Sequence, residues 1–302
     1  MIIMKRYIYL FIWCVCFAAC ADDDSLTPTK TPEFGYSVPQ GNNEYDNRIV
    51  SWNEKCNVFI LYKFDLKELY WQVTSWNESK KNEEGATYPY VKGIVGEVAD
   101  TNYVGQQLDL VEQQFLNFYP DTTLRRCLPL KLLLCSKLFN RTIQGTESRL
   151  NVYSGYDYLA LNWGSEEIQT ITTAQKNTFK NDVNYAFLTR LLNNGKVVED
   201  ADFYENANYE TTVTVANMYE RGFIKAGTKE DNDVENFIQA IIQNPYEDLL
   251  AEQKDGDTSY KGILSAKKDV NGYIRKKYDS LVNKFKNVYN IDLQAIGNAT
   301  LK

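Results

Sequence analysis

The sequence predicts an α+β fold, on three observations. Short apolar runs typical of buried strands occupy the first half of the chain. Amphipathic stretches typical of helices fill the second half, and one long helical stretch lies between the two regions. Strands that come first and helices that come later indicate an α+β layout, and the sequence shows no internal repeat of fixed period.

Three apolar runs predict the strands. The first of them is flanked by polar residues on both sides, as expected of a buried strand. The predicted strands cover residues 56–64, 127–138 and 156–163. Polar stretches at 76–86 and 140–151 predict loops between them.

Helical spacing of apolar side chains predicts the remaining elements. Residues 103–119 carry such a stripe, which ends at Pro120. Residues 233–242 and 263–289 show the same spacing, and Pro245 at a first helical position opens a further helix between them. The second half of the chain is therefore expected to be mostly helical.

Residues 172–194 form the clearest predicted helix, and Gly195 stands where a helix-ending glycine is expected. Its apolar side chains lie on two sides. One stripe consists of Phe179, Val183, Phe187 and Leu191, and the other of Leu188 and Leu192, in line with Asn181 and Tyr185. A helix that is apolar on two sides is expected to be sandwiched in the core.

The N-terminus predicts export. Residues 1–19 begin with a short positive segment and continue with an uncharged apolar run, which is the pattern of a secretory signal peptide. The small residues before Cys20 resemble a bacterial lipobox, so Cys20 is the expected lipidation site. An ordinary cleaved signal peptide with a chance cysteine is the alternative.

The next segments follow from this interpretation. Residues 20–45 would be the lipidated cysteine and a flexible tether, and residues 46–302 the globular domain. The acidic residues 22–24 resemble a surface-export signal, which would place the lipid-anchored chain on the outer membrane facing the cell exterior. A solvated acidic tether is the alternative interpretation.

The composition excludes several kinds of chemistry. The 302 residues include no histidine, which excludes the usual Ser-His-Asp and Cys-His catalytic systems, histidine acid–base catalysis and histidine-ligated zinc. The formal net charge is −7 at pH 7, and this acidic character argues against a nucleic-acid partner.

An oxidising compartment would allow one disulfide among Cys56, Cys127 and Cys135. Cys127 and Cys135 are predicted to lie on one strand, where eight residues would separate them by about 26 Å, far beyond bridging distance. A disulfide would therefore involve Cys56. Three free buried thiols are an equally good interpretation.

One segment begins like a calcium-binding loop. It reads Asp255-x-Asp257-x-Ser259, with carboxylate and hydroxyl oxygens at alternate positions. Its sixth position is Tyr260 rather than glycine and its twelfth is Ala266 rather than glutamate. These two departures exclude an EF-hand, so a solvated loop is predicted.

Several segments carry a resemblance to a known family, in the family's order. They are NVFILYKF (57–64), the helix before FYP (118–120), LPLKLLLC (128–135), the central helix, NPYEDLLAE (244–252) and YNIDLQAI (289–296). With these segments the chain resembles the zinc-binding metallopeptidase lipoproteins of Bacteroidetes, also described as substrate import-associated zinc metallohydrolase lipoproteins. The resemblance spans about residues 56–296. It implies a zincin-like fold with an N-terminal sheet, a central active-site helix and a helical C-terminal half.

The resemblance also implies where the family's zinc site would lie. The central helix carries Asn181, Asp182 and Tyr185 where the family has its His-Glu-x-x-His motif, so both zinc-binding histidines are replaced. The remaining carboxylates that could hold a hard cation are Asp182, Glu247, Asp248 and Glu252. For the last three, a solvated helix face is the alternative interpretation.

The expected function is therefore binding or assembly without zinc and without catalysis. Anchored in outer-membrane lipid through Cys20, the domain would bind peptide or glycan beside a SusC/SusD-type nutrient importer, because the resembling family accompanies such importers. Two alternatives stay open: a working metallohydrolase with a carboxylate-bound metal, and a surface glycan-binding protein. The tryptophans that could stack on sugars are instead expected to pack in the core or on the sheet, and they are Trp52, Trp71, Trp76 and Trp163.

Overall fold

The computed structural model describes residues 35–70, 93–142, 144–198 and 200–301. The predicted signal peptide, Cys20 and the predicted loop at 76–86 lie outside the described residues. The chain divides into two units, Met1–Ser37 and Val38–Lys302, and the fold described below belongs to the second.

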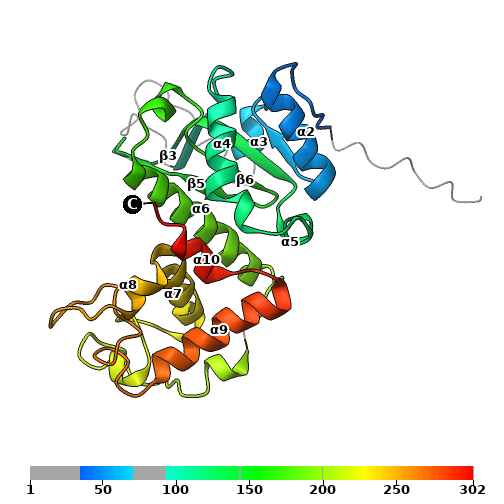
Figure 1. Ribbon diagram of the computed structural model, residues 1–302. Helices are drawn as coiled ribbons and strands as arrows, with labels where there is room; N and C mark the ends of the chain where they lie inside the picture. Colours follow the sequence, from blue (N-terminus) through cyan, green and yellow to red (C-terminus); the bar gives the residue numbers. More distant parts are fainter. Residues whose placement is uncertain (1–34, 71–92, 143, 199, 302) are drawn as a thin grey trace, which may run out of the picture. The chain divides into compact units, whose positions relative to one another are not determined.

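The described elements form a mixed α+β layout, as the sequence predicts (Figure 1). The strands are β1 (Phe59–Leu61), β2 (Gly93–Val98), β3 (Lys131–Arg141), β4 (Glu147–Arg149), β5 (Val152–Ser154) and β6 (Tyr158–Leu161). The α-helices are α2 (Glu44–Cys56), α3 (Leu66–Tyr70), α4 (Val104–Gln114), α5 (Asp121–Cys127), α6 (Thr173–Asn193), α7 (Glu230–Gln243), α8 (Tyr246–Leu250), α9 (Tyr273–Tyr289) and α10 (Leu293–Asn298). Short 3-10 helices are η2 (Leu116–Phe118), η3 (Glu166–Thr170), η4 (Ala201–Phe203) and η5 (Tyr219–Arg221).

The sheet is built around the long strand β3. Its first residues pair in parallel with β1 on one side and with β6 on the other. Its second half pairs antiparallel with β2 and β4. β5 pairs antiparallel with β6 and is the last strand of the order β1-β3-β6-β5. The described part of the chain therefore leaves one side of β5 without a neighbouring strand.

Helix α6 confirms the predicted central helix and its position in the core. The Thr172 hydroxyl caps it by accepting a hydrogen bond from the Gln175 N–H at 3.2 Å. Gly195, just beyond its last turn, has φ +63°, a left-handed conformation that glycine adopts without strain. The helix contacts α4 and β5 on the sheet side and α7 on the other. It is therefore covered on two sides, as its two apolar stripes predict.

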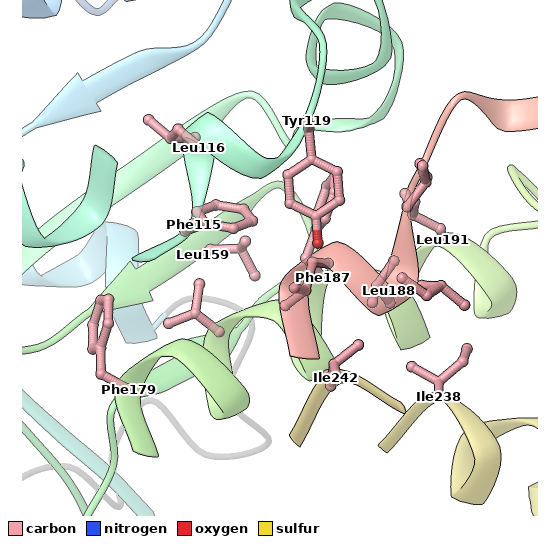
Figure 2. Packing of buried hydrophobic residues seen from close by; sticks show 14 of the residues in the cluster. Phe115, Leu116, Tyr119, Leu159, Phe179, Phe187, Leu188, Leu191, Ile238 and Ile242 are labelled. Carbon is pink, nitrogen blue, oxygen red and sulfur yellow. The ribbon is translucent and has the colours of Figure 1, made fainter. Parts of the chain in front are cut away.

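Aromatic rings join α6 to the segment after α4. The ring of Phe187 lies edge-on to Phe115 at 5.2 Å and to Tyr119 at 4.9 Å between centroids. Figure 2 shows these rings together with aliphatic side chains that reach them from the sheet and from α7. The labelled members of this cluster are Phe115, Leu116, Tyr119, Leu159, Phe179, Phe187, Leu188, Leu191, Ile238 and Ile242.

A buried ion pair joins α7 to α9 in the C-terminal half. Lys277 Nζ lies 2.5 Å from Asp233 Oδ2, and the Tyr209 hydroxyl donates a hydrogen bond to the same carboxylate oxygen at 2.8 Å. The Lys277 ammonium also lies 4.2 Å from the centre of the Phe223 ring. Both charged side chains are thus enclosed by the segment that precedes α7 and by the two helices.

The predicted strand at 127–138 is wrong at its start. Cys127 is the last residue of helix α5, and the strand begins only at Lys131. α5 follows Pro120, and Asp121 in its first turn favours the helix N-terminus. Cys127 and Cys135 therefore do not share a strand, so the predicted 26 Å spacing between them fails. All three cysteines of the described chain are free thiols.

The predicted helix at 263–289 is correct only from Tyr273 onward. Gly272, with φ +73°, precedes the first turn. The carboxylate of Asp269 accepts the N–H groups of Ile274 and Arg275, at 2.9 and 3.0 Å, and satisfies donors that a helix start leaves open. The apolar residues before Gly272 thus belong to the connection from α8 and not to the helix.

Other boundaries also differ from the prediction. The predicted strand at 56–64 is only β1, because Cys56 ends α2 and Asn57 turns with φ 56°. The predicted loop at 140–151 contains β4 and the end of β3, whose polar edge residues give no apolar signal. The predicted helix at 103–119 ends at Gln114 and continues as η2. Pro245 precedes α8 as its N-cap rather than as its first helical residue.

Candidate ligand-binding cleft

The candidate site lies on the half-exposed side of α6. Side chains three and four positions apart share one face of a helix, and on this face they are partly exposed, whereas the opposite face is buried. From Asn181 onward the partly exposed residues of the helix are Asn181, Asp182, Tyr185, Ala186, Thr189, Arg190 and Leu192. Tyr185 therefore lies on the half-exposed side, which is the side of the helix available to a ligand.

A cleft of about 850 Å³ opens beside this part of the helix. One wall is the end of α6, and the other is Ser154, the last residue of β5, with the turn that leads to β6. The lining residues are Pro129, Leu130, Ser154, Gly155, Tyr156, Asp157, Tyr185, Ala186, Thr189, Arg190, Asn193, Asn194 and Lys196. The volume lies in the range typical of ligand-binding clefts.

Arg190 fixes the distance between the two walls. Its guanidinium donates hydrogen bonds to the Ser154 hydroxyl at 3.3 Å and to the carbonyls of Gly155 and Tyr156. Burial lowers the pKa of Arg190, although a guanidinium remains charged throughout the physiological range. The turn after β5 is thus held against the helix, and Tyr156 is left 74% exposed at the rim.

The outer edge of β5 faces away from the sheet. The Asn151 carbonyl accepts the Asn162 N–H at 3.0 Å, and the Gly155 N–H donates to the Tyr158 carbonyl at 3.0 Å. In an antiparallel pair the residues alternate in direction, so the main-chain groups of Val152 and Ser154 point away from β6. No strand of the described chain pairs with these groups, and main-chain groups at such an edge can accept an extended segment as an added strand.

Asp182 is engaged in a hydrogen-bonded chain that ties α6 to the start of β5. Its Oδ2 accepts a hydrogen bond from the Asn151 side-chain amide at 2.7 Å. The Asn151 side-chain oxygen in turn accepts the Trp163 indole N–H at 2.8 Å. Burial raises the pKa of Asp182, and the bond from Asn151 opposes that change. The Asp182 carboxylate therefore anchors the start of β5.

Tyr185 stands opposite α7. Its hydroxyl lies 3.4 Å from Glu235 Oε2 and donates to it. Burial and the Glu235 carboxylate raise the pKa of Tyr185 to about 12, so the phenol keeps its proton at neutral pH. Tyr185 is therefore a hydrogen-bond donor at neutral pH.

Two asparagines of α6, Asn181 and Asn184, differ in whether their side-chain oxygen atoms have hydrogen-bond partners. Asn181 Oδ1 is buried and has no hydrogen-bond partner among the described residues. Asn184, on the buried side of the helix, accepts the Tyr119 hydroxyl at 2.8 Å and donates to the Gln114 carbonyl at 2.9 Å. Asn184 therefore crosslinks α6 to the end of α4.

The residues at the family positions do not fit zinc. Zinc sites use thiolate, imidazole and carboxylate ligands, whereas Asn181 offers an amide and Tyr185 a protonated phenol. The third residue, Asp182, already accepts a hydrogen bond from Asn151. Asp182 and Tyr185 therefore tie the helix to its surroundings, and the three side chains do not form a zinc-binding set.

The remaining metal candidates are not gathered in one place. Within the described chain, no group of three or more Cys, Asp or Glu side chains is arranged to hold a metal ion, which covers Asp182, Glu247, Asp248 and Glu252. Asp248, on α8, pairs instead with Lys261 at 3.0 Å. The alternative of a metal ion bound by these carboxylates stays a prediction from the sequence.

Sequence reasoning missed three residues of the site. Arg190 follows Ala186 by one helical turn, so helix spacing alone could have placed it on the same face. Asn151 falls in a stretch predicted as a loop, and Glu235 belongs to another helix. No sequence signal indicated those two contacts, because both depend on tertiary packing.

The two described tryptophans among the glycan-stacking candidates are packed. Trp163 is 3% exposed, and the Arg149 guanidinium lies 4.0 Å from its ring centre. Trp52 is half-buried on α2 and donates its indole N–H to Glu112 at 2.7 Å. Trp71 and Trp76 lie outside the described residues. The exposed aromatic side chain at the cleft is thus Tyr156.

Lys180 gives this helix an unusual pH response. It is 0% exposed, and its ammonium donates to the Ile296 carbonyl and to the Thr300 hydroxyl, each at 2.8 Å. Burial lowers the pKa of Lys180 to about 8, from an ordinary value near 10.5. The unfolded chain then holds more protons than the folded one between these two pH values.

The free energy of unfolding is therefore expected to rise with pH from about 8 to 10.5, relative to that of a Lys180→Met variant. The gain in free energy of unfolding over the variant is complete above about pH 10.5, the pKa of lysine in the unfolded chain, and is lost as the pH falls towards 8. Urea unfolding of both proteins at pH 7, 8, 9 and 10 measures the difference. A difference that stays flat across this range would show that Lys180 titrates normally.

Comparisons with known proteins give one structural likeness. Neither a protein-family model nor a curated protein matches the sequence. A solved structure from Bacteroides caccae ATCC 43185, provisionally named a zinc-binding metallo-peptidase, is similar with a TM-score of 0.44 and 13% identity. The similarity covers 86% of this chain and 93% of that one. Among the described residues, no helix combines the length and the apolar character needed to cross a bilayer.

Proposed function

We propose that this domain is a non-catalytic binding protein that captures an extended peptide in the cleft between α6 and β5. The observation that carries the proposal is that the end of β5 opens on a cleft of about 850 Å³ and that no strand of the described chain pairs with its outer side. An added strand would gain main-chain hydrogen bonds from Val152 and Ser154, while its side chains enter the cleft.

The cleft walls carry polar, charged and aromatic side chains, a mixture that suits a peptide with side chains of several kinds. Asn193, Asn194 and Thr189 offer donors and acceptors, Lys196 offers a positive charge, and Tyr156 offers an exposed ring. Aromatic residues with one wet edge are common in binding surfaces because they combine apolar area with a hydrogen-bonding group. The wall opposite β5 is a rigid helix, so the width of the cleft is set before a ligand arrives.

The absence of catalysis is part of the proposal. The chain has no histidine, and the positions expected from the resemblance to hold the zinc ligands carry an amide (Asn181), a hydrogen-bonded carboxylate (Asp182) and a protonated phenol (Tyr185), which do not suit zinc. The domain is accordingly proposed to hold a peptide intact.

The cellular setting is proposed on sequence grounds. The signal peptide and Cys20 would anchor the chain in the outer membrane, with the domain facing the exterior beside a SusC/SusD-type importer. Bound peptide would then be presented to that transporter. Labelling with a fatty-acid probe tests the anchor, protease treatment of intact cells tests the exposure, and co-purification from membranes tests the partner.

Substitution of Ser154 tests the cleft directly. Ser154→Pro removes the outward N–H of the edge strand, whereas Ser154→Ala removes only the hydroxyl and is the matched control. The ligand is a peptide selected from a random library by thermal shift. The Kd of the proline variant for this peptide is expected to rise about tenfold, which corresponds to the loss of one or two hydrogen bonds. The alanine variant is expected to bind within about twofold of the unchanged protein.

Two outcomes would contradict the proposal. Equal binding by the Ser154→Pro and Ser154→Ala variants would show that the ligand does not pair with β5. Cleavage of the bound peptide that stops when a chelator is added would favour the alternative hydrolase with a carboxylate-bound metal. Mass spectrometry of the peptide after incubation measures this second point.

A further inference from the structure

The connection from α8 to α9 lies outside the cleft and arranges oxygen atoms around an ammonium group. Lys268 Nζ donates three hydrogen bonds, to Asp257 Oδ1 at 3.0 Å and to the carbonyls of Ser259 and Lys261 at 2.6 and 2.7 Å. The Lys268 side chain is 5% exposed. Its charge is therefore held inside the loop by oxygen atoms of the loop itself.

The three acceptors stand at alternate positions of the sequence. Counted from Asp255, they are positions three, five and seven, the positions from which a calcium-binding loop turns oxygen atoms towards its ion. The glycine and the glutamate of an EF-hand are missing, as the sequence shows. The first half of the loop nevertheless folds as an inward-facing array of oxygen atoms, and a lysine fills it.

Further contacts hold this array in place. Asp257 Oδ1 also accepts the N–H and the hydroxyl of Ser259, at 2.9 and 2.6 Å. The Ser259 hydroxyl and Lys268 hold the pKa of Asp257 at about 2, so this carboxylate stays charged at neutral pH. The Tyr219 hydroxyl donates to the Asp257 carbonyl at 3.2 Å, which links the loop to η5.

The first carboxylate of the loop is not part of the array. Asp255 is 96% exposed and pairs with Lys267 at 2.6 Å. Two consecutive lysines thus neutralise the two carboxylates of the loop, one inside and one at the surface. Because exposed pairs contribute little to stability, the enclosed Lys268 is the cation on which the loop depends.

We propose that Lys268 is a tethered cation, which takes the place that a hard divalent ion such as Ca²⁺ would have in this loop. A cation supplied by the chain keeps the loop closed at any calcium concentration in the medium. Without the lysine side chain, the Asp257 carboxylate and the carbonyls of Ser259 and Lys261 would face one another. These are the oxygen ligands that Ca²⁺ prefers.

Hydrogen exchange of the loop amides in three proteins tests this proposal. Lys268→Ala is expected to raise the exchange rates across residues 255–264 at least tenfold, and about 10 mM Ca²⁺ is expected to restore protection, as at weak extracellular calcium sites. The same calcium addition is expected to raise the Tm of this variant by about 3 °C. The matched control is Lys267→Ala, which removes the neighbouring exposed lysine and is expected to change neither measurement.

Each other outcome would overturn the proposal. Unchanged exchange in Lys268→Ala would show that the loop needs no cation, and exchange that calcium does not restore would show that the oxygen atoms form no cation site. A calcium response of the unchanged protein as large as that of the variant would show that Lys268 does not occupy the site. If Lys268→Ala fails to fold, Lys268→Gln, which keeps the stem without the charge, is measured in the same way.

Discussion

Replacing Lys277 by methionine is expected to lower the free energy of unfolding by about 3–5 kcal/mol, the usual result of breaking a buried ion pair on one side. Asp233 is 0% exposed, and its Oδ1 already has no hydrogen-bond partner among the described residues. Burial raises the pKa of Asp233 and lowers that of Lys277, while their mutual attraction opposes both changes. Removing the ammonium leaves the carboxylate with only the Tyr209 hydroxyl.

The surroundings of Lys277 separate the loss of charge from the loss of packing. The ammonium lies 4.2 Å from the centre of the Phe223 ring, 5.2 Å from Phe203 and 5.8 Å from Phe237. Methionine fills a similar volume and packs well against aromatic rings. The destabilisation should therefore come from the unpaired Asp233, and a double variant with Asp233→Leu is expected to recover most of the lost stability.

Urea unfolding followed by circular dichroism measures these changes, and a fall in Tm of about 10 °C is expected for Lys277→Met. The matched control is Lys276→Met, because Lys276 is the exposed neighbour on the same helix. Its effect should stay within about 0.5 kcal/mol. Equal midpoints for the two variants would contradict the role given to the buried pair.

Replacing Phe187 by alanine is expected to cost about 3–5 kcal/mol, the range for deleting a fully buried aromatic ring. Its ring is 0% exposed and meets Phe115 and Tyr119 edge-on, at 5.2 and 4.9 Å between centroids (Figure 2). Edge-on ring pairs add to the energy of burial, and both pairs are lost together. The cavity would lie where α6 joins the segment after α4.

Phe118 offers the same substitution in a half-buried setting on the neighbouring 3-10 helix. Phe118→Ala removes the same atoms but less buried contact, so its cost should be at most half that of Phe187→Ala. Chemical denaturation of the two variants under one set of conditions gives the comparison. If both variants lost the same free energy of unfolding, the contacts of the Phe187 ring would not be a centre of packing.

The central helix could be predicted from sequence because local and tertiary signals agree there. Thr172 caps it, Gly195 ends it, and two apolar stripes reveal that both sides are covered. The residues before Gly272 could not be placed in the same way. Their apolar spacing suits a helix, but α9 begins later, where Asp269 accepts the N–H groups of its first turn. The position of a cap decides such boundaries, and spacing alone does not reveal it.

The cleft was only partly predictable. The family resemblance singled out Asn181, Asp182 and Tyr185, and the structure places Tyr185 at the cleft. β5 was missed, because three half-exposed residues give no apolar run. The partners of the central helix were missed as well, because Asn151 and Glu235 meet it only through the packing of other elements.

The docking of residues 296–301 on the start of α6 has a consequence for biosynthesis. Asn177 and Leu301, which are 124 positions apart, exchange two hydrogen bonds of 2.9 Å, and the acceptors of Lys180 are Ile296 and Thr300. A ribosome releases these partners more than a hundred residues after the helix that they contact. The first turns of the central helix therefore stay uncovered during synthesis until residues 296–301 have emerged.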